Sequence, residues 1–139
     1  MAESLANNTA KAMADAINTA LNAGAGAARI KIYSGTVPTD ADTALGAQVL
    51  LVDLPCTDPF APAATDAAPG GRLTANAITT TNAGANGTAS FFRMTESAGA
   101  VVLQGSVGTS GEDMNFSTVV FVSGTPIVIS SLTITQPEA

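Results

Sequence analysis

Two hydrophobic periodicities divide the chain into a short N-terminal part and a long remainder. Residues 5–22 contain no glycine or proline, and their apolar residues recur at three- and four-residue spacings, as on one face of an amphipathic helix. The stripe is made of Leu5, Met13, Ile17 and Leu21, extended by Ala10, Ala14 and Ala20. The pattern predicts a helix over residues 5–23, capped by Ser4, Asn7 or Asn8, and ended by the two glycines that follow.

From residue 29 onward the period of the pattern changes to two. Arg29–Tyr33 alternates polar and apolar residues, which predicts a strand with Ile30 and Ile32 facing inward. Residues 48–54 are a nearly continuous apolar run of strand length, and Pro55 ends it.

Further strands are expected in the second half, where apolar stretches alternate with glycine-rich turns. In the second of these strands, Phe92 and Met94 should face one side and Phe91 the other. In the last, the inward set changes phase, which a β-bulge near Ser130 and Ser131 would explain. The expected strands span residues 72–81, 88–95, 100–107, 114–121 and 127–135.

Short strands at this spacing are typical of a β-sandwich or barrel. The predicted fold is therefore mainly β, with an N-terminal α-helix followed by an antiparallel β-sandwich or barrel. The predicted organisation is an N-terminal helical arm over residues 1–26 and a single β-domain over residues 27–139. No internal repeat or domain linker interrupts the second part.

Composition and charge narrow the classes of partner. The chain has 139 residues, is 46% hydrophobic and only 4% aromatic, and carries a net charge of −6. Such a charge repels phosphate backbones and anionic headgroups, so neither nucleic acid nor membrane is an expected partner. No long apolar run predicts a membrane span. The few aromatic residues indicate a thin core, which assembly with other copies or another protein would supplement.

The residue inventory argues against catalysis. There is no histidine, which removes the commonest general base and metal ligand. Cys56 is the single cysteine, and no cationic residue beside it in sequence would activate it. We therefore expect no enzyme, no catalytic residue and no cofactor.

Carboxylates and glycine-rich turns are the remaining candidates for chemistry. Asp40 and Asp42 lie in a turn but lack the glycine and distal glutamate of a calcium loop. Glu112 and Asp113 lie in a glycine-rich loop and lack the aromatic platforms that a sugar-cleaving site uses. The glycine-rich turns lack the lysine of phosphate loops. Solvated turn residues are the expected interpretation, and no metal site is predicted.

Seven stretches of the sequence can be compared with known proteins: Ile30–Pro38, Ala41–Gly46, the proline-rich segment, Gly70–Ala75, Gly87–Met94, Gln104–Gly108 and Ile129–Ile134. Together they resemble a group of short proteins encoded among the structural genes of tailed bacteriophages and prophages. The likeness covers nearly the whole chain from Leu5. The resemblance implies a role in the virion or in its assembly, with the protein made in the host cytoplasm, and assigns no catalytic or ligand residue.

Two classes of function are compatible with that resemblance. The first is a structural protein that decorates or cements the capsid through contacts with the major capsid protein or other virion proteins. The alternative is a tail, collar or fibre-associated structural or host-binding module. The shortage of aromatic residues favours the first, because recognition sites for host molecules are usually rich in them. A homo-oligomer, with a trimer favoured, is the expected state.

Two segments are candidates for the protein interface. The helix stripe either contacts a neighbouring subunit or covers one end of its own sheet. The segment Pro55–Gly71 contains four prolines, which would keep it extended and limit the entropy lost on docking; it is either the grip on the particle or a loose surface excursion. The candidate interface residues are Leu5, Met13, Ile17, Leu21, Pro55, Phe60 and Pro62.

Overall fold

The part of the chain that the structure describes folds into one helix and eleven strands, several of them only two residues long. The structure is a computed structural model that describes residues 4–67 and 70–137. The elements are α1 (Asn7–Leu21), β1 (Arg29–Ser34), β2 (Val49–Pro55), β3 (Thr65–Ala67), β4 (Gly70–Thr74), β5 (Thr81–Asn82), β6 (Gly87–Thr95), β7 (Val101–Gly108), β8 (Met114–Asn115), β9 (Val120–Phe121), β10 (Pro126–Ile127) and β11 (Thr133–Pro137).

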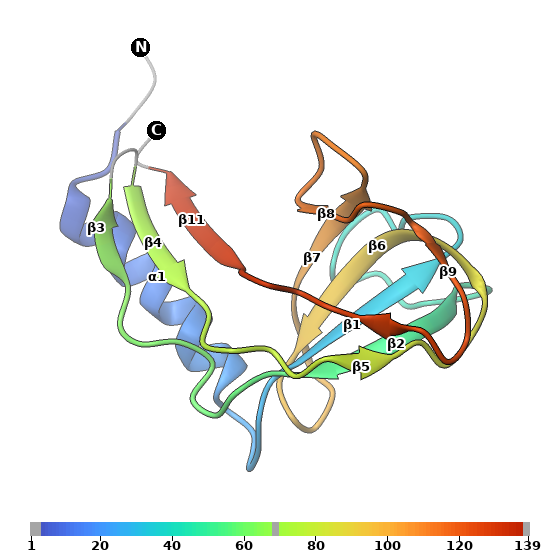
Figure 1. Cartoon of the computed structure of the whole chain (residues 1–139). Coiled ribbons are helices and arrows are strands. Elements are labelled where there is room, and N and C mark those ends of the chain that lie inside the picture. The colour runs from blue at the N-terminus through green and yellow to red at the C-terminus, as the bar shows by residue number, and fades with distance from the viewer. Residues whose placement is uncertain (1–3, 68–69, 138–139) are drawn as a thin grey trace.

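The largest sheet has the order β2-β1-β6-β7-β8, and β9 pairs with the start of β6. All of its pairings are antiparallel except that of β7 with β8. A two-stranded ladder of β5 and β10 lies beside β2 (Figure 1). The fold is mainly β, with one N-terminal helix followed by antiparallel-rich sheets in a sandwich-like arrangement, as the sequence predicts.

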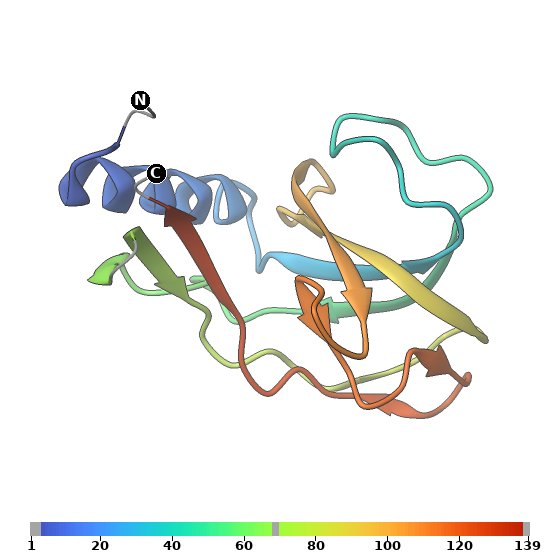
Figure 2. The ribbon, with the colours of Figure 1, turned by 90° about the horizontal axis from the view of Figure 1, so that it is seen from above.

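A separate three-stranded sheet, with the order β11-β4-β3, lies under α1 (Figure 2). Gly71 makes this close packing possible. A Cβ atom at position 71 would lie 2.5 Å from the carbonyl oxygen of Ala10 and 2.6 Å from the Cα of Lys11. The strand can approach the helix backbone so closely because position 71 has no side chain.

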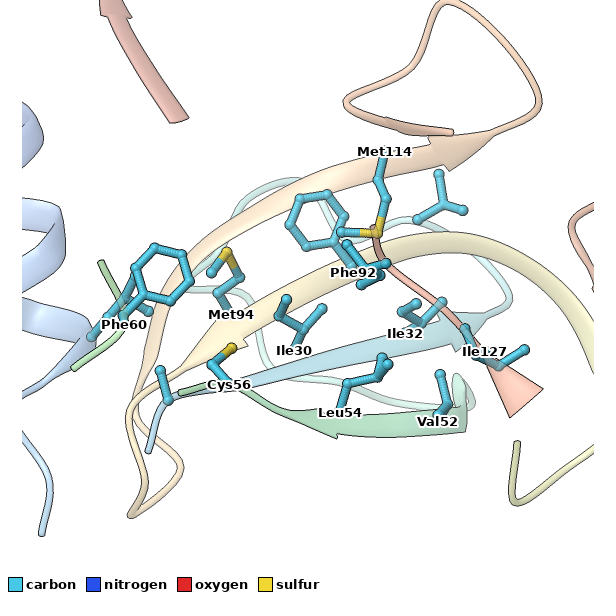
Figure 3. Packing of buried hydrophobic residues seen from close by; sticks show 14 of the residues in the cluster. Ile30, Ile32, Val52, Leu54, Cys56, Phe60, Phe92, Met94, Met114 and Ile127 are labelled. Carbon is cyan, nitrogen blue, oxygen red and sulfur yellow. The ribbon is translucent and has the colours of Figure 1, made fainter. Parts of the chain in front are cut away.

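One buried cluster joins the helix layer to the main sheet (Figure 3). It contains Ala14 and Leu21 from α1, Phe60 from the segment after β2, and Ile30 and Met94 from the main sheet. The helix is therefore a packed layer of the fold, which corrects the expectation of an arm over residues 1–26. The buried face of α1 consists of Ala10, Ala14 and Leu21, whereas Met13 is 43% exposed.

The outer face of the main sheet is covered by the loop of residues 35–48. Phe91 points to that face, opposite Phe92 and Met94, and stacks on Tyr33 with ring centroids 5.1 Å apart. Arg93 is also buried there, and its guanidinium donates hydrogen bonds to the carbonyl oxygens of Asp40 and Thr43 and to the Gln104 side chain. Phe91 is as buried as Phe92, although the two side chains lie on opposite faces of the sheet.

Two predicted strands are interrupted in the structure. Residues 72–81 form β4 and β5 with an irregular stretch between them, where Ile78 bridges to Cys56. Residues 127–135 are interrupted in the same way: Ile127 pairs with β5, and the residues from Thr133 onward pair with β4. The phase change near Ser130 and Ser131 is thus a passage from one sheet to another, and not a β-bulge.

The helix is shorter than predicted and begins without a polar cap. Its N-cap residue is Ala6, with no side-chain hydrogen bond, so none of the predicted capping residues serves that role. The Asn7 side chain donates instead to Asp66 at 3.0 Å. Packing against β4 stabilises this short helix in place of a cap.

Candidate protein-binding groove

An open groove lies where two sheets fail to meet. On one side is β8, an edge strand of the main sheet, and on the other is β11, an edge strand of the three-stranded sheet, with residues 128–132 that precede it. Two hollows of about 200 and 250 Å³ lie along this boundary, and a third of about 410 Å³, lined from β9, β10 and the residues beside them, adjoins the first at Phe116 and Val128. We call this feature the β8–β11 groove.

The hollow of about 250 Å³ beside β11 has a floor of core side chains. Phe92 and Met94, both buried, meet Leu103, Leu132 and Ile134 there. Position 105 is also at this floor, and a Cβ there would lie 2.5 Å from the ring of Phe92. A glycine at this position leaves room for the ring, so the apolar interior reaches the base of the groove.

The third hollow carries the most exposed large apolar side chains of the described chain. Val120, Val122 and Val128 are 59%, 52% and 56% exposed. Phe116 and Phe121 pack edge to face beside them, with ring centroids 5.4 Å apart. Exposed apolar residues scattered singly are ordinary, but a group of them lining one hollow is typical of a contact surface.

Charge is almost absent from the groove. Asp113 is the one charged residue among those that line the three hollows. Its Oδ2 accepts hydrogen bonds from the backbone and side chain of Ser106, at 3.0 and 3.2 Å. In the sequence no charged residue lies between Asp113 and Glu138. The surface is therefore apolar and hydroxyl-rich, with one carboxylate.

The backbone beside the groove is only partly paired. Residues 128–131 make no hydrogen bond to any other part of the described chain, whereas Ile127 pairs with Thr81 and Leu132 accepts from Ala75. Along this stretch Val128 and Ser130 are exposed and Ile129 is buried. The stretch therefore has the side-chain alternation of a strand but no ladder partner.

The helix stripe predicted as an interface serves largely as internal packing. Leu21 is fully buried in the core and Ile17 packs against it. Leu5 is half-buried, and Met13 is exposed. The expectation of a partner contact is corrected for Leu21, and the structure favours the alternative that the helix covers its own sheet.

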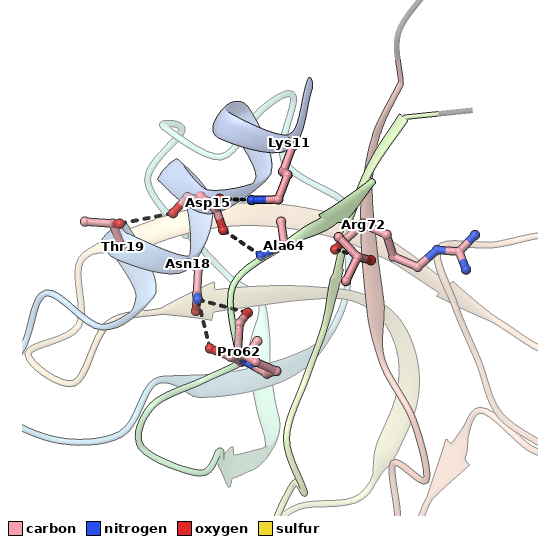
Figure 4. A network of polar contacts seen from close by, with 9 residues as sticks. Lys11, Asp15, Asn18, Thr19, Pro62, Ala64 and Arg72 are labelled. Atoms are coloured by element: carbon pink, nitrogen blue, oxygen red, sulfur yellow. Dashed lines mark hydrogen bonds and ion pairs between the residues drawn. The ribbon is translucent and has the colours of Figure 1, made fainter. Parts of the chain in front are cut away.

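The proline-rich segment is bound to the helix (Figure 4). Asp15 Oδ1 accepts a hydrogen bond from the backbone N–H of Ala64 at 2.6 Å, and the Asn18 side chain donates to the carbonyl of Ala61 at 2.9 Å. The N–H of Phe60 donates to the Asn22 side chain at 2.8 Å. These contacts hold the segment to the fold, so it is not a free excursion.

Of the three interface residues predicted in this segment, one is excluded. Phe60 is fully buried, which corrects its assignment as a contact residue. Pro55 is half-buried at the end of β2, and Pro62 is exposed. Pro69 lies outside the described residues.

The environment of Cys56 suppresses the reactivity of its thiol. Its side chain is buried, and burial raises the pKa of the thiol to about 11, although the nearby Arg29 acts to lower that pKa. Arg29 is close because it lies opposite Pro55 in the β1–β2 register. A thiol that stays protonated at neutral pH is a poor nucleophile.

Two of the four acidic residues considered for chemistry, Asp40 and Asp113, have carboxylates that accept hydrogen bonds within the fold. Asp40 Oδ1 accepts hydrogen bonds from Thr43 and from the N–H of Asp42, and these bonds lower the pKa of the Asp40 carboxyl. The backbone N–H of Glu112 donates to the Asn115 side chain. Within residues 4–67 and 70–137, no group of three or more acidic, Cys or His side chains is placed to hold a metal ion.

The groove is the feature that sequence reasoning missed. The pattern assigned residues 114–121 and 127–135 to strands of the predicted sandwich or barrel and did not single out an exposed surface on them. A signal was present, because this is the longest uncharged stretch of the chain and has valines at adjacent positions on both strand faces.

Comparisons with known proteins give no relative: no family model, curated protein or solved structure matches this chain. Across the described residues, no helix is both long enough and apolar enough to cross a membrane.

Proposed function

We propose that this chain is a non-enzymatic structural protein of a tailed-phage virion, and that it decorates or cements the capsid through protein–protein contacts. The observation that carries the binding role is the β8–β11 groove, a surface with a single charged lining residue, Asp113, and three valines more than half exposed. Apolar patches rimmed by polar groups are typical of protein interaction sites. The virion setting comes from the sequence resemblance described above.

The charge distribution supports an outward-facing position. A protein of net charge −6 is repelled by packaged DNA and is accommodated on the outside of a particle. The Cys56 thiol and the Asp40 carboxylate are engaged in the fold itself, which supports binding rather than catalysis. Assembly as a homo-oligomer, a trimer in the first instance, is part of the proposal.

The decisive experiment is to count the chain in purified particles of the phage that encodes it. Quantitative mass spectrometry against the major capsid protein gives the copy number, and separation of heads from tails gives the location. Copy numbers in the hundreds on heads support decoration, because the capsid shell repeats its subunits by symmetry. Copy numbers of about a dozen or fewer, found with tails, would assign the chain to a tail, collar or fibre part. Absence from particles would reject the virion role.

A further inference from the structure

The β8–β11 groove is flanked by backbone that is ready to form a ladder. β8 is the last strand of its sheet, and β11 is the last strand of the other. Between the end of β10 and the start of β11, residues 128–131 have no hydrogen-bond partner in the described chain. Unpaired strand edges are templates for another strand, and natural proteins usually cover, twist or charge them. Residues 128–131 carry no charge themselves, and Asp113 is the one charged residue that lines the same hollow.

We infer that the groove binds an extended segment of another polypeptide, which adds a strand beside residues 128–131. The segment would form main-chain hydrogen bonds with this edge, and alternate side chains would enter the hollows lined by Phe92, Leu132 and Phe116. This mode of recognition draws affinity from the main chain and specificity from the pockets for alternate residues. The inference rests on the proposed function only in assigning that segment to a neighbouring virion protein.

The chemistry of the groove selects the occupant. Its hollows are open; the one lined by residues 128–133 is mainly polar and suits Thr, whereas the other two are more apolar and suit Val or Ile. These three residue types also favour extended structure. Asp113 is the single charge among the lining residues, and the chain as a whole is at −6. A segment that bears Lys or Arg is therefore favoured over one that bears Asp or Glu.

A second copy of this chain is the less favoured occupant. A copy would bring a net charge of −6 to a groove whose one charged lining residue is Asp113, so charge complementarity disfavours it there. The proposed homo-oligomer would then assemble through another surface. A small molecule is also disfavoured, because the hollows lie open along a boundary, whereas small-ligand sites usually enclose most of their ligand.

The test uses the whole chain and a synthetic peptide of alternating Thr and Val with a Lys at each end. Because any extended peptide offers ladder hydrogen bonds, we expect saturable binding at peptide concentrations below about 1 mM. In two-dimensional NMR spectra the largest shift changes should fall on the amides of residues 113–116 and 128–133. The amides of residues 128–131 should become protected from hydrogen exchange.

Two matched peptides separate a ladder from simple apolar contact. A peptide with one central Val replaced by proline keeps most of the apolar surface but loses a donor and the strand conformation, and we expect at least ten-fold weaker binding. A peptide with Glu in place of Lys should also bind more weakly. Equal binding by the proline peptide would overturn strand addition, and no shift change with about 1 mM of the Lys peptide would overturn the groove as a site.

Two variants of the protein test whether the peptide binds at the groove. Val128→Asp puts a carboxylate on the exposed edge and should weaken peptide binding at least ten-fold. Val37→Asp makes the same change at a similarly exposed valine on the loop over the other face of the sheet, and should leave binding unchanged. Circular dichroism of both variants shows whether the fold is kept, and peptide-induced shifts in the wild-type chain do not depend on either variant folding.

Sedimentation of the protein alone tests whether a second copy of the chain occupies the groove. If the wild-type chain self-associates and Val128→Asp makes it monomeric, a second copy occupies the groove and the peptide inference is wrong. This result would leave the copy number in particles untouched, so failure of the groove inference and failure of the proposed function remain distinguishable.

Discussion

The apolar residues of this protein are mostly buried at the helix end, where α1 packs on β4, and partly exposed at the groove end, around the β8–β11 groove. At the helix end, α1 and the segment around Phe60 pack into each other, and hydrogen bonds from Asn18 and to Asp15 and Asn22 fix the segment to the helix. At the groove end, Val120, Val122 and Val128 are exposed, and residues 128–131 have no ladder partner. The difference indicates that the apolar residues of one end serve stability, and those of the other are free to serve binding.

The comparison also revises the role of the proline-rich segment. Its prolines suggested a docking arm, but Phe60 and Ala61 are buried and Ala64 is held by Asp15. Removal of residues 57–68 would therefore unfold the helix layer rather than only weaken a contact with the particle. Any docking role of the helix end is limited to side chains that remain exposed, such as Met13 and Pro62.

The largest expected effect is at Phe60. Phe60→Ala should lower the free energy of unfolding by about 3–5 kcal/mol, because a fully buried aromatic side chain is removed and a cavity is left. Chemical denaturation of both proteins measures the difference. Pro62→Ala is the control in the same segment, and its effect should stay within about 0.5 kcal/mol because Pro62 is exposed. A small effect at Phe60 would mean that the segment does not pack as described.

Alkaline pH should destabilise the protein through Cys56. The thiol has a pKa of about 11 in the folded chain, above its usual value, because burial disfavours the thiolate. The unfolded chain therefore loses this proton at lower pH than the folded chain does. Stability should be unaffected below the unfolded pKa and fall as pH rises from about 9 to 11, by up to about 3 kcal/mol. Denaturation at several pH values measures this effect, with Cys56→Ala as the control. The free energy of unfolding should fall more steeply with rising pH in the wild type than in the variant.

The close approach of β4 to α1 is tested at Gly71. Gly71→Ala should cost about 1–3 kcal/mol, because the new methyl group would meet helix backbone that cannot move aside alone. Gly46→Ala is the matched control, since a Cβ there meets nothing closer than 3.8 Å. Thermal unfolding of the two variants should separate them by several degrees. Equal melting temperatures would contradict the packing of the helix layer.

A smaller effect is expected from the hydrogen bond that fixes the segment to the helix. Asp15→Ala leaves the N–H of Ala64 without its acceptor and should cost about 1–2 kcal/mol. The exposed pair of Asp15 with Lys11 adds little to that value. Lys11→Ala is the control, and should change the free energy of unfolding by less than about 0.5 kcal/mol. An equal effect of both variants would assign the loss to the ion pair.

The smallest effect on stability is expected at the groove end. Val128→Thr replaces a side chain that is 56% exposed, so the free energy of unfolding should change by no more than about 0.5 kcal/mol. The same measurement on Ile129, its buried neighbour, provides the contrast: Ile129→Thr should cost at least about 1 kcal/mol, because a hydroxyl replaces apolar volume in the core. Similar values at both positions would contradict the distinction between groove and core.

The sequence by itself determined the element types. The helical spacing before residue 24, the two-residue period after residue 29 and the glycine-rich turns follow from backbone geometry, and they correctly predicted a helix followed by antiparallel-rich sheets. The inward-facing residues Ile30 and Ile32 were predictable for the same reason, because alternation along a strand is local. The ends of the elements and the helix cap were predicted less well, since local patterns only weakly fix them.

Tertiary structure alone decided which apolar residues are available for contact. The stripe on α1 could face a partner or its own sheet, and the absence of a side chain at Gly71 let β4 occupy that face. Residues 127–135 looked like one strand, but their partner strand is interrupted where Ile78 bridges to Cys56, so the ladder breaks and the groove opens. Such pairings join residues far apart in the chain, and a local pattern of hydrophobic and polar positions does not specify them.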